Sequence, residues 1–135
     1  MEKETLKAIS DYFVAEKVEF RGGMVHVDEM VYDIYTDEEA QELAKDSIEE
    51  SLWAFSPWFL ARMTDIDEVV FNALRNLDDN ANEAVLALVE NSCGLNDFVE
   101  EAIATDGRGH FINSYDGEEH EIEVGGETFF LYRDE

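Results

Sequence analysis

The stretch of residues 49–64 (EESLWAFSPWFLARMT) constrains the fold of this chain most strongly. It contains both tryptophans, two phenylalanines and the only proline of the chain. Aromatic side chains bury the largest area per residue, so we expect the core to centre here, with Trp53 and Trp58 inside it. Ser56 and Pro57 divide the stretch, because a serine cap followed by proline at the first helical position starts a new helix. The sequence therefore predicts a corner between two helices. The alternative is that the tryptophans form an exposed docking patch.

Length and composition predict one folded domain over residues 1–135. The hydrophobic content of 45% and the aromatic content of 12% exclude the disordered class. No apolar run reaches the roughly 18 residues that a membrane-spanning helix needs, and the charged start does not match a secretory signal. The single cysteine, Cys93, cannot form an internal disulfide, which fits a reducing compartment. We therefore expect a cytoplasmic protein.

The first part of the chain has mixed helix and strand signals. A helix is expected over residues 4–16, and a hairpin over 18–27 with glycines at its turn. A third strand is expected over 31–35. Thr36 and Glu39 form a capping box, in which each side chain satisfies the other residue's amide group. The helix that begins there is expected to run to about Phe55.

The middle of the chain is predicted to be helical. Thr64 with Asp67 is expected to open a helix, and its apolar residues recur at helical spacing over 66–77. Further helices are expected over 84–89, which Gly94 ends, and over 96–103, which Asn96 caps. A turn is expected at 78–80.

Beyond Gly109 the pattern changes to strands. The expected strands, separated by hairpin signals at Asp116-Gly117 and Gly125-Gly126, are residues 110–114, 119–124 and 127–133. The predicted fold class is α+β. It has a central array of about four to five helices, an N-terminal helix and hairpin, and a C-terminal antiparallel β-hairpin or small sheet.

Charge is the second strong signal, with 34 acidic against nine basic residues and a formal net charge of -25. Residues 46–135 contain 22 acids, four arginines and no lysine. Such a surface repels nucleic acid and anionic membranes and attracts basic protein surfaces. Direct binding to nucleic acid or membrane is therefore excluded, and a basic protein partner is expected.

Two groups of acids are candidates for imitating the phosphates of nucleic acid. One lies on the helix that follows Thr36 and the other in the tail: Glu38, Glu42, Asp46, Glu49 and Glu50, and then Glu118, Glu119, Glu121 and Glu123. Duplex DNA carries one charge per about 1.7 Å of axis, so 25 net charges correspond to roughly 40 Å of duplex. Mimicry requires these acids to gather on one face. Otherwise they are solvated surface.

A second candidate site is the densest polar cluster, formed by Asp106, Arg108, His110, Tyr115 and Asp116. It could be a small acid–base site, with His110 as base and Arg108 gripping an anion. Alternatively, Arg108 ties Asp106 and Asp116 together in a hairpin turn.

No metal or cofactor is expected. Asp78-x-Asn80-x-Asn82 resembles half of a calcium loop, but Val89 occupies the position of the bidentate glutamate. The histidines and Cys93 do not have zinc-ligand spacing. A nucleophilic pair of Cys93 and a histidine depends on the fold bringing the two together.

The tail DGRGHFINSYDGEEHEIEVGGETFFLYR, with LWAFSPWFLARMT upstream, resembles small bacteriophage and prophage proteins that end in a DGRGHF…SYDG…YR block. The similarity covers roughly Thr36 to Arg133. It implies a viral or mobile-element origin and action in the host-cell cytoplasm. It carries over no functional residues.

The leading hypothesis is a DNA mimic without catalytic activity. It would occlude a basic, nucleic-acid-binding surface of a host defence protein, as an anti-restriction or anti-CRISPR protein does. The alternatives are a small enzyme that uses the polar cluster, and a phage accessory or assembly adaptor that packs through the aromatic corner. The sequence leaves the identity of the partner and the oligomeric state open.

Overall fold

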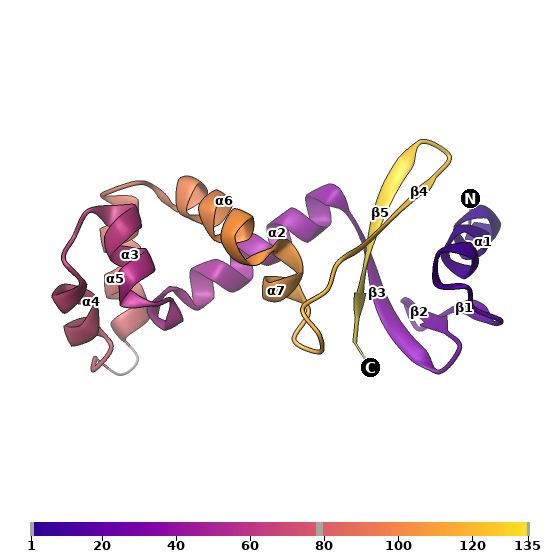
Figure 1. Cartoon of the computed structure of the whole chain (residues 1–135), viewed down its shortest axis with the longest axis horizontal. Coiled ribbons are helices and arrows are strands. Elements are labelled where there is room, and N and C mark those ends of the chain that lie inside the picture. Colours follow the sequence, from indigo (N-terminus) through magenta and orange to yellow (C-terminus); the bar gives the residue numbers. More distant parts are fainter. Residues whose placement is uncertain (1, 78–79, 135) are drawn as a thin grey trace. The chain divides into compact units, whose positions relative to one another are not determined.

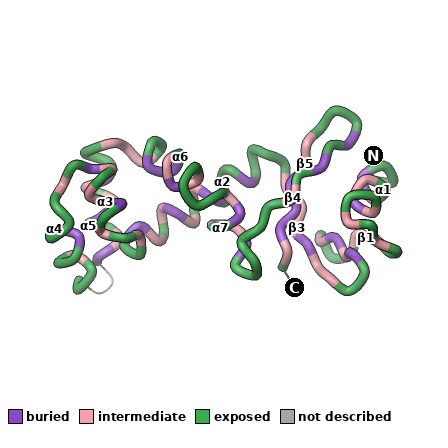
Figure 2. The backbone as a smooth tube through the Cα atoms, in the orientation of Figure 1, coloured by how far each residue is buried: buried purple, intermediate pink, exposed green. Residues whose placement is uncertain are grey.

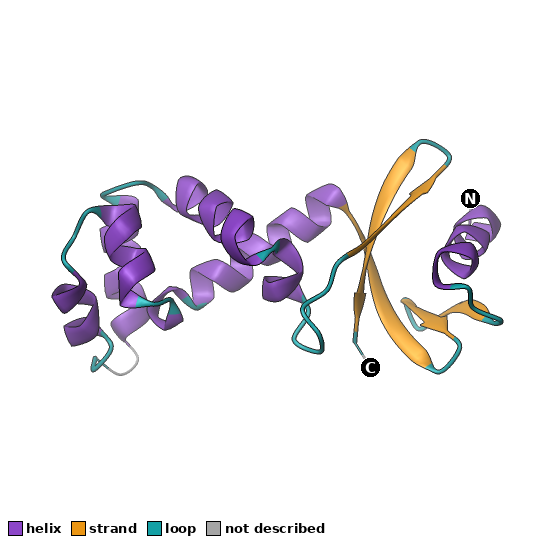
Figure 3. Cartoon of the chain, in the orientation of Figure 1, coloured by secondary structure: helices purple, strands orange, loops and turns teal. Residues whose placement is uncertain are grey.

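The computed structural model describes residues 2–77 and 80–134, and it has the predicted α+β class (Figures 1 and 3). The described elements are α1 (Glu2–Phe13), β1 (Val18–Arg21), β2 (Met24–Val27), β3 (Met30–Thr36), α2 (Asp37–Glu50), the 3-10 turn η1 (Leu52–Ala54), α3 (Pro57–Thr64), α4 (Glu68–Leu74), α5 (Ala81–Glu90), α6 (Leu95–Asp106), α7 (Arg108–Ile112), β4 (His120–Val124) and β5 (Glu127–Arg133). The chain divides into a sheet unit, residues 1–44 and 107–135, and a helical unit, residues 45–106. The expectation of a single domain stays a prediction.

The sheet unit contains an antiparallel sheet of five strands in the order β1-β2-β3-β5-β4. The first three strands meet the last two where β3 pairs with β5, from Tyr32 opposite Arg133 to Thr36 opposite Phe129. The predicted strands at 18–20, 24–27, 31–35, 119–124 and 127–133 are therefore confirmed to within a residue or two. Their layout is corrected, because the N-terminal hairpin and the C-terminal strands form one sheet. The helices also differ from the predicted four or five, with seven in the described residues.

One face of the sheet packs against α1, which lies mainly along the edge strands β4 and β1. Side chains alternate between the two faces of a strand, so Val25 and Val27 of β2 point to the same face. They form a buried core with Ile9 of α1, Ile122 of β4 and Leu131 of β5. The predicted first helix is confirmed, but it spans Glu2–Phe13 rather than residues 4–16. Its buried residues, Thr5 and Ile9, cover part of this side of the sheet.

The opposite face carries a smaller core made by Ala40 of α2 with Phe130 and Tyr132 of β5, against which Ile112 of α7 packs. The predicted strand at 110–114 is therefore wrong, because its first residues belong to α7. A five-residue stretch is too short for periodicity to separate helix from strand. Tertiary packing decides it, since the helical turn brings Ile112 onto the sheet.

The helical unit is built around the Ser56-Pro57 corner, which is confirmed. The Ser56 hydroxyl accepts a hydrogen bond from the amide of Phe59 at 3.2 Å. The Phe59 ring stacks on Phe55 and meets Phe98 of α6 edge-on, at centroid distances of 5.6 and 5.3 Å. Buried positions recur along α5 and α6 at helical spacing (Figure 2). The aromatic corner is thus the centre of this unit.

The prediction that the tryptophans lie in the core is wrong. Trp53 is 47% exposed and Trp58 is 57% exposed. The inner side of the corner is occupied by Leu52, Phe59 and Leu60, all of which are buried. Each aromatic or aliphatic residue in this dense stretch competes for the same small core, and the two largest rings remain at its surface.

Several predicted helix ends are corrected. The helix after Thr36 stops at Glu50 and gives way to η1, rather than running to Phe55. Thr64 ends α3, and Asp67 alone caps α4 by accepting from the amide of Val69 at 2.9 Å. Leu95 begins α6, which places Asn96 inside its first turn.

The apolar pattern over 66–77 is also misleading about burial. Within α4, Phe71 is buried, whereas Val69 is 66% exposed. Gly94 does end the preceding helical region, with φ of +89° and its amide bonded to the carbonyl of Val89 at 2.8 Å. The turn predicted at 78–80 begins with two residues that lie outside the described ones.

Candidate partner-binding surface

Arg108 of α7 joins three elements of the sheet unit. Its Nη1 donates to Oδ1 of Asp37, at the start of α2, and its Nε donates to Oε1 of Glu119, just before β4, both at 2.7 Å. The guanidinium carbon lies 4.5 Å from the ring centroid of Phe130 on β5. The arginine side chain is only 9% exposed. We call these residues, with Tyr132, the Arg108 junction.

The junction is held in one charge state. Burial lowers the pKa of Arg108, but the hydrogen bonds to Glu119 and Asp37 outweigh this effect and raise it overall. Glu119 also accepts a short hydrogen bond from the Tyr132 hydroxyl. Burial, and then this bond, raises the pKa of Tyr132. Arg108 therefore stays cationic and Tyr132 stays protonated, and the junction is a fixed structural anchor.

Two rows of acids begin at this junction. Glu38 and Glu42 are exposed on α2, directly after Asp37, while Glu121 and Glu123 are exposed on β4, shortly after Glu119. Glu121 is paired with Phe130, so these two side chains share a sheet face, and α2 packs on that same face. Glu121 and Glu123 thus lie on the sheet face that carries α2, and Glu38 and Glu42 lie on the exposed side of α2. We call these four glutamates the acidic ridge.

The other predicted partner-binding acids have different surroundings. Glu119 is committed to Arg108 and Tyr132, so it holds the ridge in place. Glu118 is exposed and lies 3.7 Å from Nε2 of His120. Asp46, Glu49 and Glu50 belong to the helical unit, where Glu49 is half-buried and the other two are exposed.

Each unit is strongly acidic on its own. The sheet unit has 20 acids against six bases, and the helical unit has 14 against three. In the described part of the chain, the carboxylates that pair with lysine or arginine are Asp11, Glu19, Asp37, Glu101 and Glu119. Most of the acidic residues in this part of the chain therefore have no lysine or arginine as an ion-pair partner.

The alternative polar cluster does not form a site around Arg108. Its ion-pair partners are Asp37 and Glu119, so the predicted tie to Asp106 and Asp116 is wrong. Asp37 lies 71 positions away in the sequence, and no local signal indicates that contact. Asp106 is the last residue of α6, in the helical unit.

The remaining members of that cluster have separate partners. His110 is exposed, with its ring edge-on to Phe111 at 5.0 Å. Tyr115 lies under the guanidinium of Arg133 at 4.2 Å. Asp116 accepts from the side-chain amide of Asn113 at 2.6 Å, which closes the turn before β4. These contacts shape the loop and do not assemble an acid–base pair.

Sequence reasoning missed a second polar group, centred on His120 of β4. Its Nδ1 lies 3.1 Å from the Tyr12 hydroxyl of α1, and its ring meets Phe13 edge-on at 5.1 Å and Tyr32 at 5.8 Å. The His120 side chain is 18% exposed. This aromatic cage joins the end of α1 to the edge of the sheet, through contacts between residues distant in the sequence.

Other chemistry finds little support in the described residues. Over 2–77 and 80–134, His, Cys, Asp and Glu side chains do not gather in threes as metal ligands. The half calcium loop begins at Asp78, outside these ranges. Burial raises the pKa of Cys93, which is the opposite of what an activated thiolate needs. Nor does any described helix combine the length and the apolar character required to cross a bilayer.

Comparisons with protein-family models, curated proteins and solved structures gave no match to this chain. The chemistry of its surface is therefore what points to a function.

Proposed function

We propose that this chain is a phage-encoded protein that binds the basic, nucleic-acid-binding surface of a host defence protein and occludes it. The defence protein would be of the restriction or CRISPR type, and the bound protein would act as a DNA mimic. The observation that carries the proposal is the Arg108 junction, because it anchors the first turn of α2 and the entry to β4 by 2.7 Å ion pairs. The acidic ridge begins at both anchors.

The spacing of the ridge suits an array of lysines and arginines. Glu38 and Glu42 are one helical turn apart, which is about 6 Å along the axis. Glu121 and Glu123 are two residues apart on one strand face, which is roughly 7 Å. A single DNA strand carries one charge per about 3.4 Å, so each row has about half its linear charge density. The rest of the acidic surface adds long-range attraction.

The mechanism is electrostatic steering followed by steric exclusion of nucleic acid. Complementary charge raises the association rate, and salt screens it. Catalysis is not part of this mechanism, and the partner loses activity only because its substrate cannot reach the basic surface.

A displacement experiment tests the proposal. A fluorescent 20-base-pair duplex is bound to purified host restriction or CRISPR nucleases, and its anisotropy is followed as the protein is added at 50 and 300 mM NaCl. We expect release of the duplex from a nuclease at the lower salt and weaker release at the higher one. Retention of the duplex on every nuclease at 50 mM NaCl contradicts the proposal.

Charge reversal then locates the surface. The ridge variant carries Glu38→Lys, Glu42→Lys, Glu121→Lys and Glu123→Lys. The matched control reverses four other exposed acids: Glu16, Glu29, Glu90 and Glu100. Both variants change the net charge by the same amount, so a difference in their displacement of the duplex shows that binding depends on the position of the acids. We expect at least a tenfold loss of displacement in the ridge variant and less than threefold in the control. Equal losses of displacement in the two variants contradict the assignment of the binding surface to the acidic ridge.

One observation favours a second function, that of an assembly adaptor. Trp53 and Trp58 are about half exposed, and tryptophan is enriched in protein interfaces. Sedimentation velocity at 100 µM tests this function. An oligomer that dissociates in a Trp58→Ser variant supports the adaptor, whereas a monomeric wild type contradicts homo-oligomeric assembly.

A further inference from the structure

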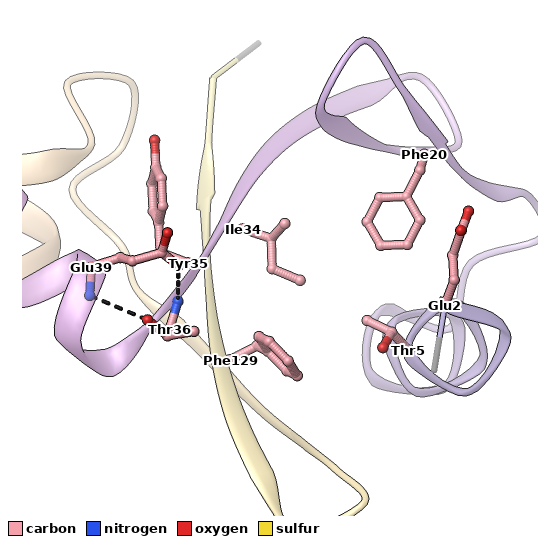
Figure 4. Close-up of a pocket in the computed structure, with 8 residues that line it drawn as sticks. All are labelled: Glu2, Thr5, Phe20, Ile34, Tyr35, Thr36, Glu39 and Phe129. Carbon is pink, nitrogen blue, oxygen red and sulfur yellow. Dashed lines mark hydrogen bonds between the residues drawn. The ribbon is translucent and has the colours of Figure 1, made fainter.

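The sheet unit contains a pocket of about 410 Å³ between α1 and the sheet (Figure 4). It is lined by Glu2, Thr5, Phe20, Ile34, Tyr35, Thr36, Glu39 and Phe129. Its position follows from the packing of α1, which lies mainly along the edge strands β4 and β1, so that side chains of β3 and β5 remain accessible beside it. The pocket is shallow and widely open to solvent.

Most of the exposed surface inside this pocket is apolar. Figure 4 shows Ile34 of β3, Phe129 of β5 and Phe20 of β1 facing a common space, with Thr5 of α1 beside it. All three apolar side chains pack on the main core at their inner ends but remain half-buried. The volume lies in the range of about 300–1,000 Å³ that ligand pockets occupy. An apolar group therefore fits the interior.

The charge of the pocket determines which charged groups can lie next to the apolar group of a ligand. Its eight lining residues include two glutamates, Glu2 and Glu39, and neither lysine nor arginine. Glu39 is held in place because its Oε1 accepts from the amide of Thr36 at 3.0 Å. Glu2 comes from α1, on the side of the pocket next to Phe20 (Figure 4). An apolar anion is repelled here, and an apolar group beside a cation is attracted.

We propose that this pocket receives an apolar side chain of the basic partner, flanked by one cationic side chain that faces Glu2 and another that faces Glu39. This inference rests on the proposed function. It assigns different roles in binding to the acidic ridge and to the pocket. The ridge glutamates Glu121 and Glu123 lie on the opposite face of the sheet from the pocket, so the ridge attracts the partner at long range and speeds association. The pocket makes the close contact that slows dissociation, because anchors held in pockets carry most of the binding energy of interfaces.

Three capped peptides probe the pocket: Lys-Phe-Lys, Lys-Ala-Lys and Glu-Phe-Glu. Binding is followed by methyl NMR of the full chain, with the signal of Ile34 as the reporter. We expect Lys-Phe-Lys to shift Ile34 and to bind at least fivefold more tightly than Lys-Ala-Lys, and Glu-Phe-Glu to leave the spectrum unchanged. Equal affinity for the two lysine peptides overturns the inference, as does a lack of any shift at Ile34.

Two variants confirm the place of binding. Ile34→Phe fills the pocket and should weaken binding of Lys-Phe-Lys at least fivefold, with the aromatic-ring NMR signal of Phe129 as the reporter. Glu2→Gln lies on exposed helix surface, carries little risk to folding, and should weaken it about threefold. The matched control Glu29→Gln removes one exposed charge in the turn before β3 and should change affinity by less than 1.5-fold. Unchanged affinity in both pocket variants overturns the inference.

Failure of the inference and failure of the proposed function are distinguishable. The ridge variant should lose duplex displacement yet bind Lys-Phe-Lys within threefold of the wild type. Displacement that survives both pocket variants removes the pocket from the interface and leaves the proposed function standing. Absence of displacement by the wild type removes the function, whatever the peptides do.

Discussion

Arg108 neutralises two carboxylates and covers an aromatic ring with one guanidinium group. The guanidinium is the common counter-charge of Asp37 and Glu119, whose side chains are 70% and 30% exposed, and its loss leaves both carboxylates without it. Glu119 additionally accepts from Tyr132, so the effect of a change at Arg108 spreads to β5. Single residues of this kind decide whether the two acidic rows hold their positions.

We predict that Arg108→Gln lowers the free energy of unfolding by about 1.5–3 kcal/mol, because it removes a largely buried guanidinium group and its charged hydrogen bonds to Asp37 and Glu119. Arg108→Lys should lower the free energy of unfolding by a smaller amount, because lysine keeps the positive charge. It should still be destabilising, because lysine cannot donate to both carboxylates with the geometry of a guanidinium group. Urea denaturation measures both. Arg21→Gln is the control, because Arg21 pairs with Glu19 at a side-chain exposure of 66% and should cost under about 0.5 kcal/mol. If Arg108→Gln and Arg21→Gln lower the free energy of unfolding by similar amounts, the Arg108 junction does not stabilise the fold.

Gly109 allows α7 to approach the chain that leads into β4. A Cβ at this position would lie 2.6 Å from the carbonyl oxygen of Gly117 and 2.8 Å from the carbonyl carbon of Glu118. Both contacts are with backbone, so Gly109→Ala should cost about 2–3 kcal/mol. Gly22→Ala is the comparison, with open space but φ of +63° and an expected cost of about 1 kcal/mol. Thermal unfolding gives both values, and a smaller loss at Gly109 than at Gly22 would disprove the close approach.

Asp33 of β3 gives a pH-dependent prediction. Burial, and then the nearby Asp134, raises the pKa of Asp33. The folded protein therefore binds this proton more tightly than the unfolded chain, and stability falls as pH rises from the ordinary aspartate pKa through the raised one. Asp33→Asn should increase the melting temperature at pH 7 by about 1–3 °C. The gain should vanish near pH 3, where both forms are neutral, and a gain that persists there points to another cause.

The helices and strands of this chain depend to different extents on local chemistry. The capping box at the start of α2 is formed as predicted, since the Glu39 amide donates to Oγ1 of Thr36 at 3.2 Å and the Thr36 amide donates back to Glu39 at 3.0 Å. The box also fixes the wall of the pocket at Glu39. By contrast, α7 has no cap made by a side chain. It depends on its packing against the sheet.

Thr36→Ala should therefore destabilise the protein by about 1 kcal/mol, the usual cost of losing a helix cap. Circular dichroism during thermal unfolding measures the loss. Ser114→Ala, at an exposed loop position, is the control and should stay within about 0.5 kcal/mol of the wild type. If Thr36→Ala behaves like the control, the capping box does not stabilise α2 in solution.

For the whole molecule, the dominant quantity is the net charge of -25. Since both units are acidic, self-repulsion opposes folding throughout the chain. Added salt should therefore raise the stability of the fold and lower the affinity for the basic partner. It stabilises the fold by screening repulsion between carboxylates, and it weakens the complex by screening attraction to the basic partner.

We predict that raising NaCl from 20 to 500 mM increases the melting temperature by several degrees, because the Debye length falls from more than 20 Å to about 4 Å. A variant that neutralises exposed acids, with Glu90→Gln, Glu100→Gln and Glu127→Gln, should respond less. Differential scanning fluorimetry checks both. A melting temperature that is independent of salt would show that the carboxylates are already compensated.

The sequence by itself determined the α+β class, the capping box at Thr36 and Glu39, the Ser56-Pro57 corner and the acidity, because each depends on composition or on residues close together in the chain. Only the tertiary structure decided that β3 pairs with β5, that Arg108 pairs with Asp37, and that a pocket lies between α1 and the sheet. It also placed Trp53 and Trp58 at the surface. These features depend on contacts between residues distant in the sequence and on competition for space in a small core. Short-range sequence patterns therefore do not predict them.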